Sequence, residues 1–355
     1  MTQDAPIRRA LQHLATGASL SSEMAAVAFG AVMRGEATAV EMAALLLGLR
    51  AKGESADEIT GAARALRDAM VKLDVGSVDG VVDTCGTGGG TVGTLNISTA
   101  AAFVVAGAGV PVAKHGNRSY TSRSGSADVL EALGVDIALL PARAAAVLGE
   151  VGLVFLFAPT YHPAMRHVAP VRKELGVATI MNLLGPLANP AGVARQVVGV
   201  SSEQHAPLVA RALAELGTTH ALVLHAAVGM DEVSPAGPTR IWEVRGGEVA
   251  RWAITPQQHG LECEDLGGLT GGEPAENARR IERLLEGGGT KVERCAVVLN
   301  AAAALYVSGH GWSLEESASR ARAAIESGAG AEVLARLRSA APRGAPPRTA
   351  GAPSS

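Results

Sequence analysis

The stretch DTCGTGGGTVGTLNIST, residues 83–99, indicates the fold class of this chain. It contains five glycines, six hydroxyl side chains and one asparagine, and almost no large side chain. The apolar residues Val81 and Val82 precede it, and AAAFVVAG, which has helical spacing, follows it. A strand, a glycine-rich loop and a helix in this order form a basic unit of α/β proteins.

The glycines of this stretch also point to a ligand. Without Cβ atoms, backbone N–H groups can converge on a cluster of oxygens, and the N-terminus of the following helix favours anions. The stretch therefore suits a phosphate group. The alternative is a flexible turn in which Ser98 or Thr99 only caps the helix.

Two common nucleotide sites fit the stretch poorly. Gly88-x-Gly90-x-x-Gly93 matches the dinucleotide pattern, but such a site needs an acidic residue about 20 positions further on, where this chain has the basic Lys114. A Walker loop would end in Gly-Lys-Ser/Thr, and Gly93 is followed by Thr-Leu. An NAD enzyme and a nucleotide kinase are both disfavoured.

Beyond the stretch, short apolar runs alternate with helical segments. This alternation predicts an α/β domain with a mostly parallel sheet. The predicted strands are Val81–Asp83, Val110–Lys114, Leu153–Phe157, Gln196–Val200 and His220–His225, followed by an antiparallel excursion at Thr239–Val244 and Glu248–Ile254. Helices are expected again from Ala275.

The two ends of the chain differ from this middle part. The first ~70 residues have only helical periodicity, which predicts a small all-helical domain over residues 1–74 with apolar faces that need a partner. The end of the chain, AAPRGAPPRTAGAPSS, is rich in proline and predicts a disordered tail over residues 339–355.

Composition excludes several classes of protein. The chain of 355 residues has a net charge of −3, which offers no electrostatic basis for binding nucleic acid or an anionic membrane. Its three cysteines form no CxxC pair, so neither a disulfide framework nor a zinc site is indicated. No signal-peptide core and no apolar run of about 20 residues is found. These features predict a cytoplasmic protein.

A second polar cluster, KHGNRSYTSRSGS, residues 114–126, also follows a predicted strand and precedes a helix. Lys114 and Arg118 contribute positive charge, and several serines contribute hydroxyl groups. Two such loops at the ends of adjacent strands could enclose a substrate with several phosphate groups. The alternative is a solvated basic turn.

A polyphosphate usually arrives with Mg²⁺, which prefers oxygen ligands. Asp231 and Glu232 follow a predicted strand in a loop that can direct both carboxylates to one place, although spacing alone leaves this open. Glu315 and Glu316 form a similar pair, but they begin a predicted helix, where the helix dipole explains them. Arg172 could bind a planar carboxylate in a two-pronged way.

Together these segments resemble the anthranilate phosphoribosyltransferase family of tryptophan biosynthesis. The resemblance rests on the motifs GTGG (86–89), NIST (96–99), KHGNRS (114–119), SGSADVLEALG (124–134), HPAMRHVAPVRKELG (162–176), NLLGPLANP (182–190) and MDEVS (230–234). It extends from the N-terminal helices to about residue 338.

The resemblance implies a two-domain fold similar to that of the pyrimidine nucleoside phosphorylases. A small helical domain, 1–74, to which residues 163–190 return, would accompany an α/β domain formed by 75–162 and 191–338. Members of the family are usually homodimers through the helical domain. The implied reaction transfers phosphoribose from phosphoribosyl pyrophosphate (PRPP) to the amine of anthranilate and releases pyrophosphate, with two Mg²⁺ per subunit.

The resemblance also assigns the site, residue by residue. Anthranilate would contact Gly86, Asn117 and Arg172, and the metal ligands would be Ser98, Asp231 and Glu232. The reaction requires no strong general base, and His115 is the candidate if one acts. The residues implied for PRPP are Gly86, Gly89, Gly90, Thr94, Asn96, Ile97, Ser98, Thr99, Lys114, His115, Gly116, Asn117, Arg118, Ser119, Tyr120, Thr121, Ser122 and Ser126.

One position departs from the family pattern. The family commonly has GTGGD, whereas this chain has Gly90 at the fifth position. A carboxylate near the magnesium site is therefore missing, and we expect an altered Mg²⁺ dependence with activity retained. Two other functions stay open at this stage, a pyrimidine-nucleoside-phosphorylase-like enzyme and a non-catalytic paralogue that binds a ligand or nucleic acid.

Overall fold

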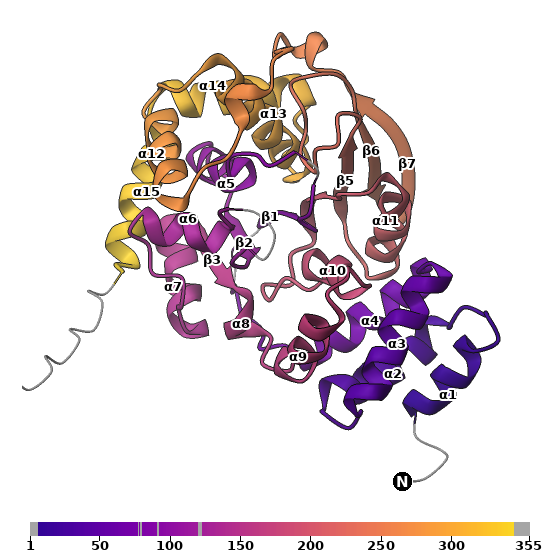
Figure 1. The fold of residues 1–355 in the computed structure, drawn as a ribbon. Helices are drawn as coiled ribbons and strands as arrows, with labels where there is room; N and C mark the ends of the chain where they lie inside the picture. Colours follow the sequence, from indigo (N-terminus) through magenta and orange to yellow (C-terminus); the bar gives the residue numbers. More distant parts are fainter. Residues whose placement is uncertain (1–5, 77, 79, 91, 120–122, 344–355) are drawn as a thin grey trace, which may run out of the picture.

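The computed structural model describes residues 6–76, 78, 80–90, 92–119 and 123–343 (Figure 1). A small bundle of N-terminal helices lies beside a larger α/β domain in Figure 1. This arrangement confirms the predicted fold class.

A seven-stranded sheet forms the centre of the larger domain, in the order β3-β2-β1-β4-β5-β6-β7. The first five strands of this order are parallel, whereas β6 and β7 are antiparallel. The strands are β1 Val82–Gly86, β2 Val112–Gly116, β3 Leu153–Phe157, β4 Arg195–Gly199, β5 His220–Ala226, β6 Thr239–Arg245 and β7 Glu248–Ile254. Each predicted strand is present, with its ends shifted by at most three residues.

The parallel strands are buried on both faces, which explains their continuous apolar runs. Helix α5 packs on β1 and β2, and α13, α14 and α15 pack on α5. The helices that follow the first strands and that end the chain are α5 Ile97–Gly107, α6 Ser126–Ala132, α7 Pro141–Val151, α8 Ala158–Tyr161, α11 Ala206–Glu215, α12 Pro274–Leu285, α13 Lys291–Val307, α14 Leu314–Glu326 and α15 Ala329–Ala340. Short 3-10 turns lie at Gly185–Leu187, Glu203–His205, Pro256–His259 and Gly267–Leu269.

The N-terminal bundle contains α1 Pro6–Leu14, α2 Ser22–Met33, α3 Ala39–Lys52 and α4 Ala56–Ala69. Reciprocal capping boxes start two of these helices, Thr38 with Glu41 at α3 and Ser55 with Glu58 at α4. Of the helices in the segment 163–190, α9 Met165–Leu175 contacts α2 and α3, and α10 Met181–Leu184 contacts α4. One apolar cluster joins the bundle to α11 and to one face of β4, β5 and β6. The exact domain boundaries stay a prediction because this cluster continues from the bundle into the sheet.

The prediction of a disordered tail over residues 339–355 is wrong for residues 339–343. Helix α15 extends to Ala340, and Asp136 N donates a hydrogen bond of 2.8 Å to Ala341 O. Val135 and Pro342 form an isolated β-bridge, and an Arg343 side-chain nitrogen lies 3.1 Å from Glu131 O. These tertiary contacts hold residues 339–343, whereas 344–355 lie outside the described residues. In the described part of the chain, no helix has the length and apolar character needed to cross a membrane.

Candidate active site

The two predicted loops leave the sheet side by side, since β1 and β2 are parallel neighbours that end at Gly86 and Gly116. In the first loop, Gly88 and Gly89 have φ angles of 67° and 82°, a conformation that glycine adopts without strain. The backbone therefore requires glycine at these two positions. The two loops meet at the carboxyl edge of the sheet, where ligands of α/β proteins usually bind.

The glycine loop is held from both sides by backbone hydrogen bonds. Thr87 N donates to Gly199 O at 2.8 Å, at the end of β4. Further along, Leu95 N donates to Leu269 O at 2.7 Å, and Thr94 and Thr270 form a β-bridge. The segment around 269–271 carries no functional signal in the sequence, and sequence reasoning missed it.

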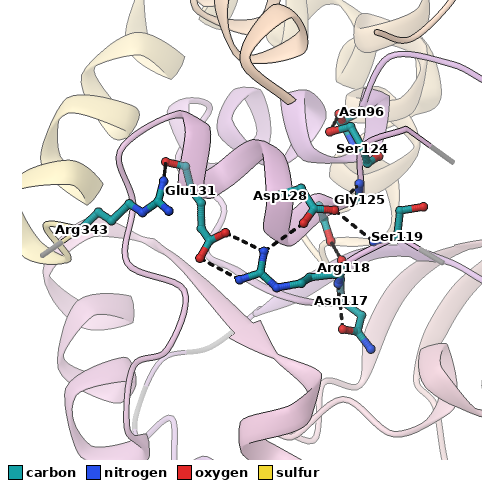
Figure 2. Close-up of polar contacts among 10 residues, drawn as sticks. Asn96, Asn117, Arg118, Ser119, Ser124, Gly125, Asp128, Glu131 and Arg343 are labelled. Carbon is teal, nitrogen blue, oxygen red and sulfur yellow. Dashed lines mark hydrogen bonds and ion pairs between the residues drawn. The ribbon is translucent and has the colours of Figure 1, made fainter. Parts of the chain in front are cut away.

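Asn96 connects the two loops. Its Nδ2 donates to Ser124 O at 2.9 Å, and its Oδ1 accepts from Ser124 Oγ at 3.2 Å (Figure 2). The same Oδ1 accepts from Asn277 Nδ2 at 3.0 Å. Asn277 lies in α12 and is buried, and no local motif marks it. The side chains of the neighbouring Ile97 and Thr99 are buried in the core, so Ile97 can offer a ligand only its main chain.

Asp231 is wedged between the glycine loop and the sheet. A Cβ added at Gly90 would lie 2.7 Å from Asp231 Oδ1, one at Gly86 would lie 3.3 Å from Asp231 Oδ2, and one at Gly199 would overlap the Asp231 carbonyl. The glycines thus form a cradle for this carboxylate. Burial raises the pKa of Asp231 above the usual range of an aspartate.

Glu232 lies beside Asp231 and is more deeply enclosed. Thr94 Oγ1 donates to Glu232 Oε1 at 3.2 Å, whereas Glu232 Oε2 is buried and has no hydrogen-bond partner within the described part of the chain. Burial, and next the charge of Asp231, raise the pKa of Glu232 well above its usual value. An orphaned carboxylate oxygen of this kind fits a site built for a cation.

These donors suit Mg²⁺ better than a transition metal. Among the described residues, no group of three or more His, Cys, Asp and Glu side chains could hold a metal by itself. Mg²⁺ is commonly bound by one or two carboxylates together with substrate phosphates and water. Asp231 and Glu232, which lie beside the glycine loop, meet this requirement.

The loop that carries Asp231 and Glu232 is held in place by a residue that sequence reasoning missed. Asn300, in α13, accepts from Val233 N at 2.9 Å and donates to Val233 O at 2.9 Å. It also donates to Ala296 O, so its carboxamide has partners for both its oxygen and its nitrogen. This clamp fixes the backbone directly after Glu232.

Lys114 brings a buried positive charge to the same place. Its Nζ donates to Thr84 O and, at 3.2 Å, to Ser98 Oγ. Burial lowers the pKa of Lys114, and the carboxylates of Asp83 and Glu232 act in the opposite direction. Lys114 thus lies near both Ser98 and Glu232, and the roles of these residues in binding an anion and a metal stay a prediction.

Asp83, at the start of the quoted stretch, is buried on β1. It accepts from His115 N at 3.2 Å and from Asn189 Nδ2 at 2.7 Å, and Asn189 belongs to the NLLGPLANP motif. Burial raises the pKa of Asp83, and the nearby positive charge of Lys114 opposes this shift. Asp83 therefore ties β1, β2 and the segment 163–190 into one unit.

His115 and His162 form a buried pair with 3.2 Å between their Nε2 atoms. His115 Nδ1 lies 3.1 Å from Gly185 O, and a carbonyl only accepts, so the His115 Nε2 accepts from His162. Burial lowers the pKa of His115 to about 3 and that of His162 to about 4. Both rings are uncharged at neutral pH. The role of His115 as a base stays a prediction, and both of its ring nitrogens already have protein partners.

The second loop is organised by acidic residues of α6. Asp128 Oδ2 accepts from Ser119 N at 3.1 Å and from Gly125 N at 2.9 Å (Figure 2). Ser126 Oγ donates to Asn117 O at 3.3 Å. The predicted contacts Tyr120, Thr121 and Ser122 lie outside the described residues.

Arg172 lies outside both loops, in a helix. It lies in the last turn of α9, the helix that contacts α2 and α3, and its side chain is half-buried. Of the two histidines near this helix, His162 joins the buried pair with His115, whereas His167 packs against Gly35, just after the end of α2.

Comparisons with known proteins agree with this architecture. A family model described as "Glycosyl transferase family, a/b domain" matches residues 78–331, and one described as "Glycosyl transferase family, helical bundle domain" matches residues 8–70. Anthranilate phosphoribosyltransferase of Rubrobacter xylanophilus is 50% identical over 331 residues, which cover 93% of this chain and 96% of that protein.

Two solved structures are also closely similar. The anthranilate phosphoribosyltransferase of Thermus thermophilus matches with a TM-score of 0.88 and 44% identity, over 93% of this chain and 98% of that one. The enzyme of Saccharomyces cerevisiae in complex with PRPP and Mg matches with a TM-score of 0.87 and 28% identity, over 95% of this chain and 98% of that one. This chain belongs to the anthranilate phosphoribosyltransferase family.

Proposed function

We propose that this chain transfers phosphoribose from PRPP to the amine of anthranilate, giving N-(5-phosphoribosyl)anthranilate and pyrophosphate. One observation carries the proposal for the site. The glycine loop, the buried Lys114 and the orphaned carboxylate of Glu232 meet at one edge of the sheet. A nucleoside phosphorylase or a non-catalytic paralogue is not favoured by the relatives.

During the reaction, the bond between the ribose carbon and pyrophosphate breaks and a bond to the anthranilate nitrogen forms. Negative charge develops on the pyrophosphate oxygens, where Lys114 and the loop N–H groups stabilise it. The aniline-type nitrogen loses its proton after attack, and bulk solvent or pyrophosphate can accept it. The protein acts mainly by positioning the two substrates.

Mg²⁺ fits the acidic donors at the back of this loop. Ser98, Asp231 and Glu232 would hold it, with two ions per subunit as the family resemblance implies. When bound, Mg²⁺ would neutralise charge on the leaving pyrophosphate. The two carboxylates are ionised more readily once a cation is near them, because the cation offsets their burial.

The remaining site assignments follow the family motifs. Anthranilate would contact Gly86, Asn117 and Arg172, with the Arg172 guanidinium facing its carboxylate. The proposed PRPP contacts are Gly86, Gly89, Gly90, Thr94, Asn96, Ile97, Ser98, Thr99 and residues 114–122, together with Ser126. Both substrates are soluble metabolites, and we propose that the enzyme acts in the cytoplasm.

The decisive experiment follows the loss of anthranilate fluorescence in the presence of PRPP and Mg²⁺. We expect consumption that requires both, and a fall of at least about tenfold in kcat/KM for anthranilate in Arg172→Ala, since a two-pronged charge-assisted contact is lost. Lys173→Ala, the exposed neighbour on the same helix, is the matched control and should stay near wild type. Binding of PRPP without consumption of any anthranilate would contradict the proposal.

We also propose a homodimer formed through the helical domain. Three apolar side chains of α2 and α3 are exposed in the single chain, Val27, Val40 and Leu47, at 53%, 78% and 49%. Exposed apolar surface of this kind commonly marks an interface. Sedimentation velocity of Val40→Asp with Leu47→Asp should show a monomer, and an unchanged dimer would contradict this interface.

A further inference from the structure

Arg118 lies in the second loop, where a phosphate ligand is expected, yet its side chain contacts other residues of the protein. Its guanidinium makes a two-pronged pair with Glu131, at 2.6 and 2.8 Å, and a third contact of 3.0 Å with Asp128 (Figure 2). The ring of Phe157, at the end of β3, lies 5.7 Å from its Cζ. Arg118 is thus committed to residues of the protein itself.

The charges of this group make release unfavourable. Hydrogen bonds from Arg118 lower the pKa of Glu131, and the loop N–H groups and Arg118 lower the pKa of Asp128. Both acids are ionised at neutral pH, so one cation faces two anions. If Arg118 moved to a phosphate, Asp128 and Glu131 would lose their ion-pair partner beside a negatively charged substrate.

The same acids shape the loop. Asp128 closes it by accepting from Ser119 N and Gly125 N, and the second of these hydrogen bonds caps the start of α6. Gly125 packs so closely on the main chain of residues 117–119 that any Cβ would collide with it. On the far side, Arg343 donates to Glu131 O and holds α6 from the C-terminal segment.

From this geometry we infer that Arg118, Asp128 and Glu131 form a latch that positions the second loop for PRPP, and that the Arg118 guanidinium is not a phosphate ligand. The inference rests on the proposed function and deepens it. Arg118 is therefore a positioning residue, and its main chain remains part of the loop.

The two roles of Arg118 predict opposite effects of Glu131→Gln. If Arg118 belongs to the latch, the substitution loosens the loop and raises the Kd for PRPP, measured by calorimetry with Mg²⁺ present, by about fivefold, a size typical of a half-exposed two-pronged pair. If Arg118 were a phosphate ligand held back by Glu131, the same substitution would release it and tighten PRPP binding.

Two further variants sharpen the test. Arg118→Gln should raise the Kd to a similar extent, and the double variant should be no weaker than either single one, because both remove one interaction. Arg118→Lys keeps the charge but not the fork, so it should behave like Arg118→Gln. In Glu131→Gln, kcat at saturating substrates should stay within about twofold of wild type, whereas KM for PRPP rises.

The Arg143–Glu150 pair on α7 provides the matched control. It is also a two-pronged surface pair, at 3.0 and 3.3 Å, and it lies outside the loop. Glu150→Gln should leave PRPP affinity unchanged. If Glu131→Gln unfolds the protein, Glu131→Asp replaces it, since the shorter side chain cannot make the two-pronged pair with Arg118. The direction of the change in the Kd for PRPP then distinguishes the two roles in the same way.

The outcomes separate the latch from the proposed function. Wild-type protein that gives no heat with PRPP would overturn the function itself. Wild-type binding with tighter or unchanged binding in Glu131→Gln would overturn the latch alone. Additive losses in the double variant would do so as well, because they would mean that Arg118 acts on PRPP independently of Glu131.

Discussion

Two pairs of acidic side chains stand near the two loops, and their environments are opposite. Asp128 and Glu131 are partly exposed, face Arg118 and have lowered pKa values. Asp231 and Glu232 are half-buried residues, and the Glu232 Oε2 atom is fully buried. Both have raised pKa values, and none of the ion pairs in the described part of the chain includes them. The first pair has an ion-paired cation within the protein, whereas the charge of Lys114 offsets only part of the burial of Glu232 in the second.

The difference teaches how to separate structural acids from functional ones. An ionised carboxylate that is buried without a partner costs stability, so it persists only where a ligand supplies the missing charge. A paired carboxylate at a helix start stabilises the fold instead. Replacing an acid in each pair should therefore change stability in opposite directions.

The largest effect is expected for Glu232→Gln. Removing the charge should lower kcat/KM by at least about 100-fold, comparable to the loss of one electrostatic contact in an active site. The same change should raise the melting temperature, because an uncompensated buried charge disappears. Steady-state assays and thermal unfolding without Mg²⁺ measure both.

The control for this variant is Glu315→Gln, an exposed residue in the first turn of α14. It should keep full activity. A Glu232→Gln protein that is active and less stable than wild type would break the comparison, because Glu232 would then be a structural acid.

The buried histidines His115 and His162 extend the comparison to the pH dependence of stability. The folded pKa of His162 is lowered to about 4, below the unfolded value near 6.5, so the unfolded state binds more protons between these limits. The free energy of unfolding should fall as pH drops from 7 to 5. In His162→Asn this fall should be smaller by about 2 kcal/mol.

Denaturant unfolding at several pH values measures this difference. His13, which is only partly buried in α1, provides the control variant His13→Asn. Parallel pH profiles of wild type and His162→Asn would show that folding does not lower the pKa of His162.

A smaller loss is expected for Asp128→Asn. The substitution removes the ion pair with Arg118 and weakens the cap at the start of α6, which should lower the free energy of unfolding by about 1 kcal/mol. The sign is opposite to that for Glu232→Gln. Chemical denaturation of both variants in one series tests it, and a gain in stability would contradict the paired assignment.

The smallest effect is expected for Gly90→Asp. A side chain here meets Asp231 Oδ1 at once, so the loop has to shift by a few tenths of an ångström or more. We expect activity to be retained and the half-saturating Mg²⁺ concentration to change by about threefold, equivalent to ~0.6 kcal/mol. Identical Mg²⁺ titrations of variant and wild type would show that residue 90 does not affect the Mg²⁺ dependence.

Local signals explain why so much could be predicted. The strands follow from short apolar runs, and both loops follow from glycine and hydroxyl residues placed directly after strands. The pair Asp231 and Glu232 was found because adjacent acids in a loop are conspicuous. The assignment of individual ligands depended on the family motifs, and it stays a prediction.

The contacts that sequence reasoning missed span long separations. Asn277 reaches Asn96 over 181 positions, Asn300 reaches Val233 over 67, and Asn189 reaches Asp83 over 106. A single buried asparagine has no periodicity and no spacing rule, so nothing local distinguishes it from an exposed one. The end of α15 was misplaced for the same reason, because its last residues are held by contacts near Val135.

The amino-acid sequence by itself determined the α/β class, the two loops and the chemistry of their side chains, because strand, turn and helix preferences act over a few residues. Only the tertiary structure decided which of these charges are compensated. It pairs Arg118 with Asp128 and Glu131 and leaves Glu232 Oε2 without a partner among the described residues. Compensation depends on burial and distance in space, and both arise only when the chain is folded.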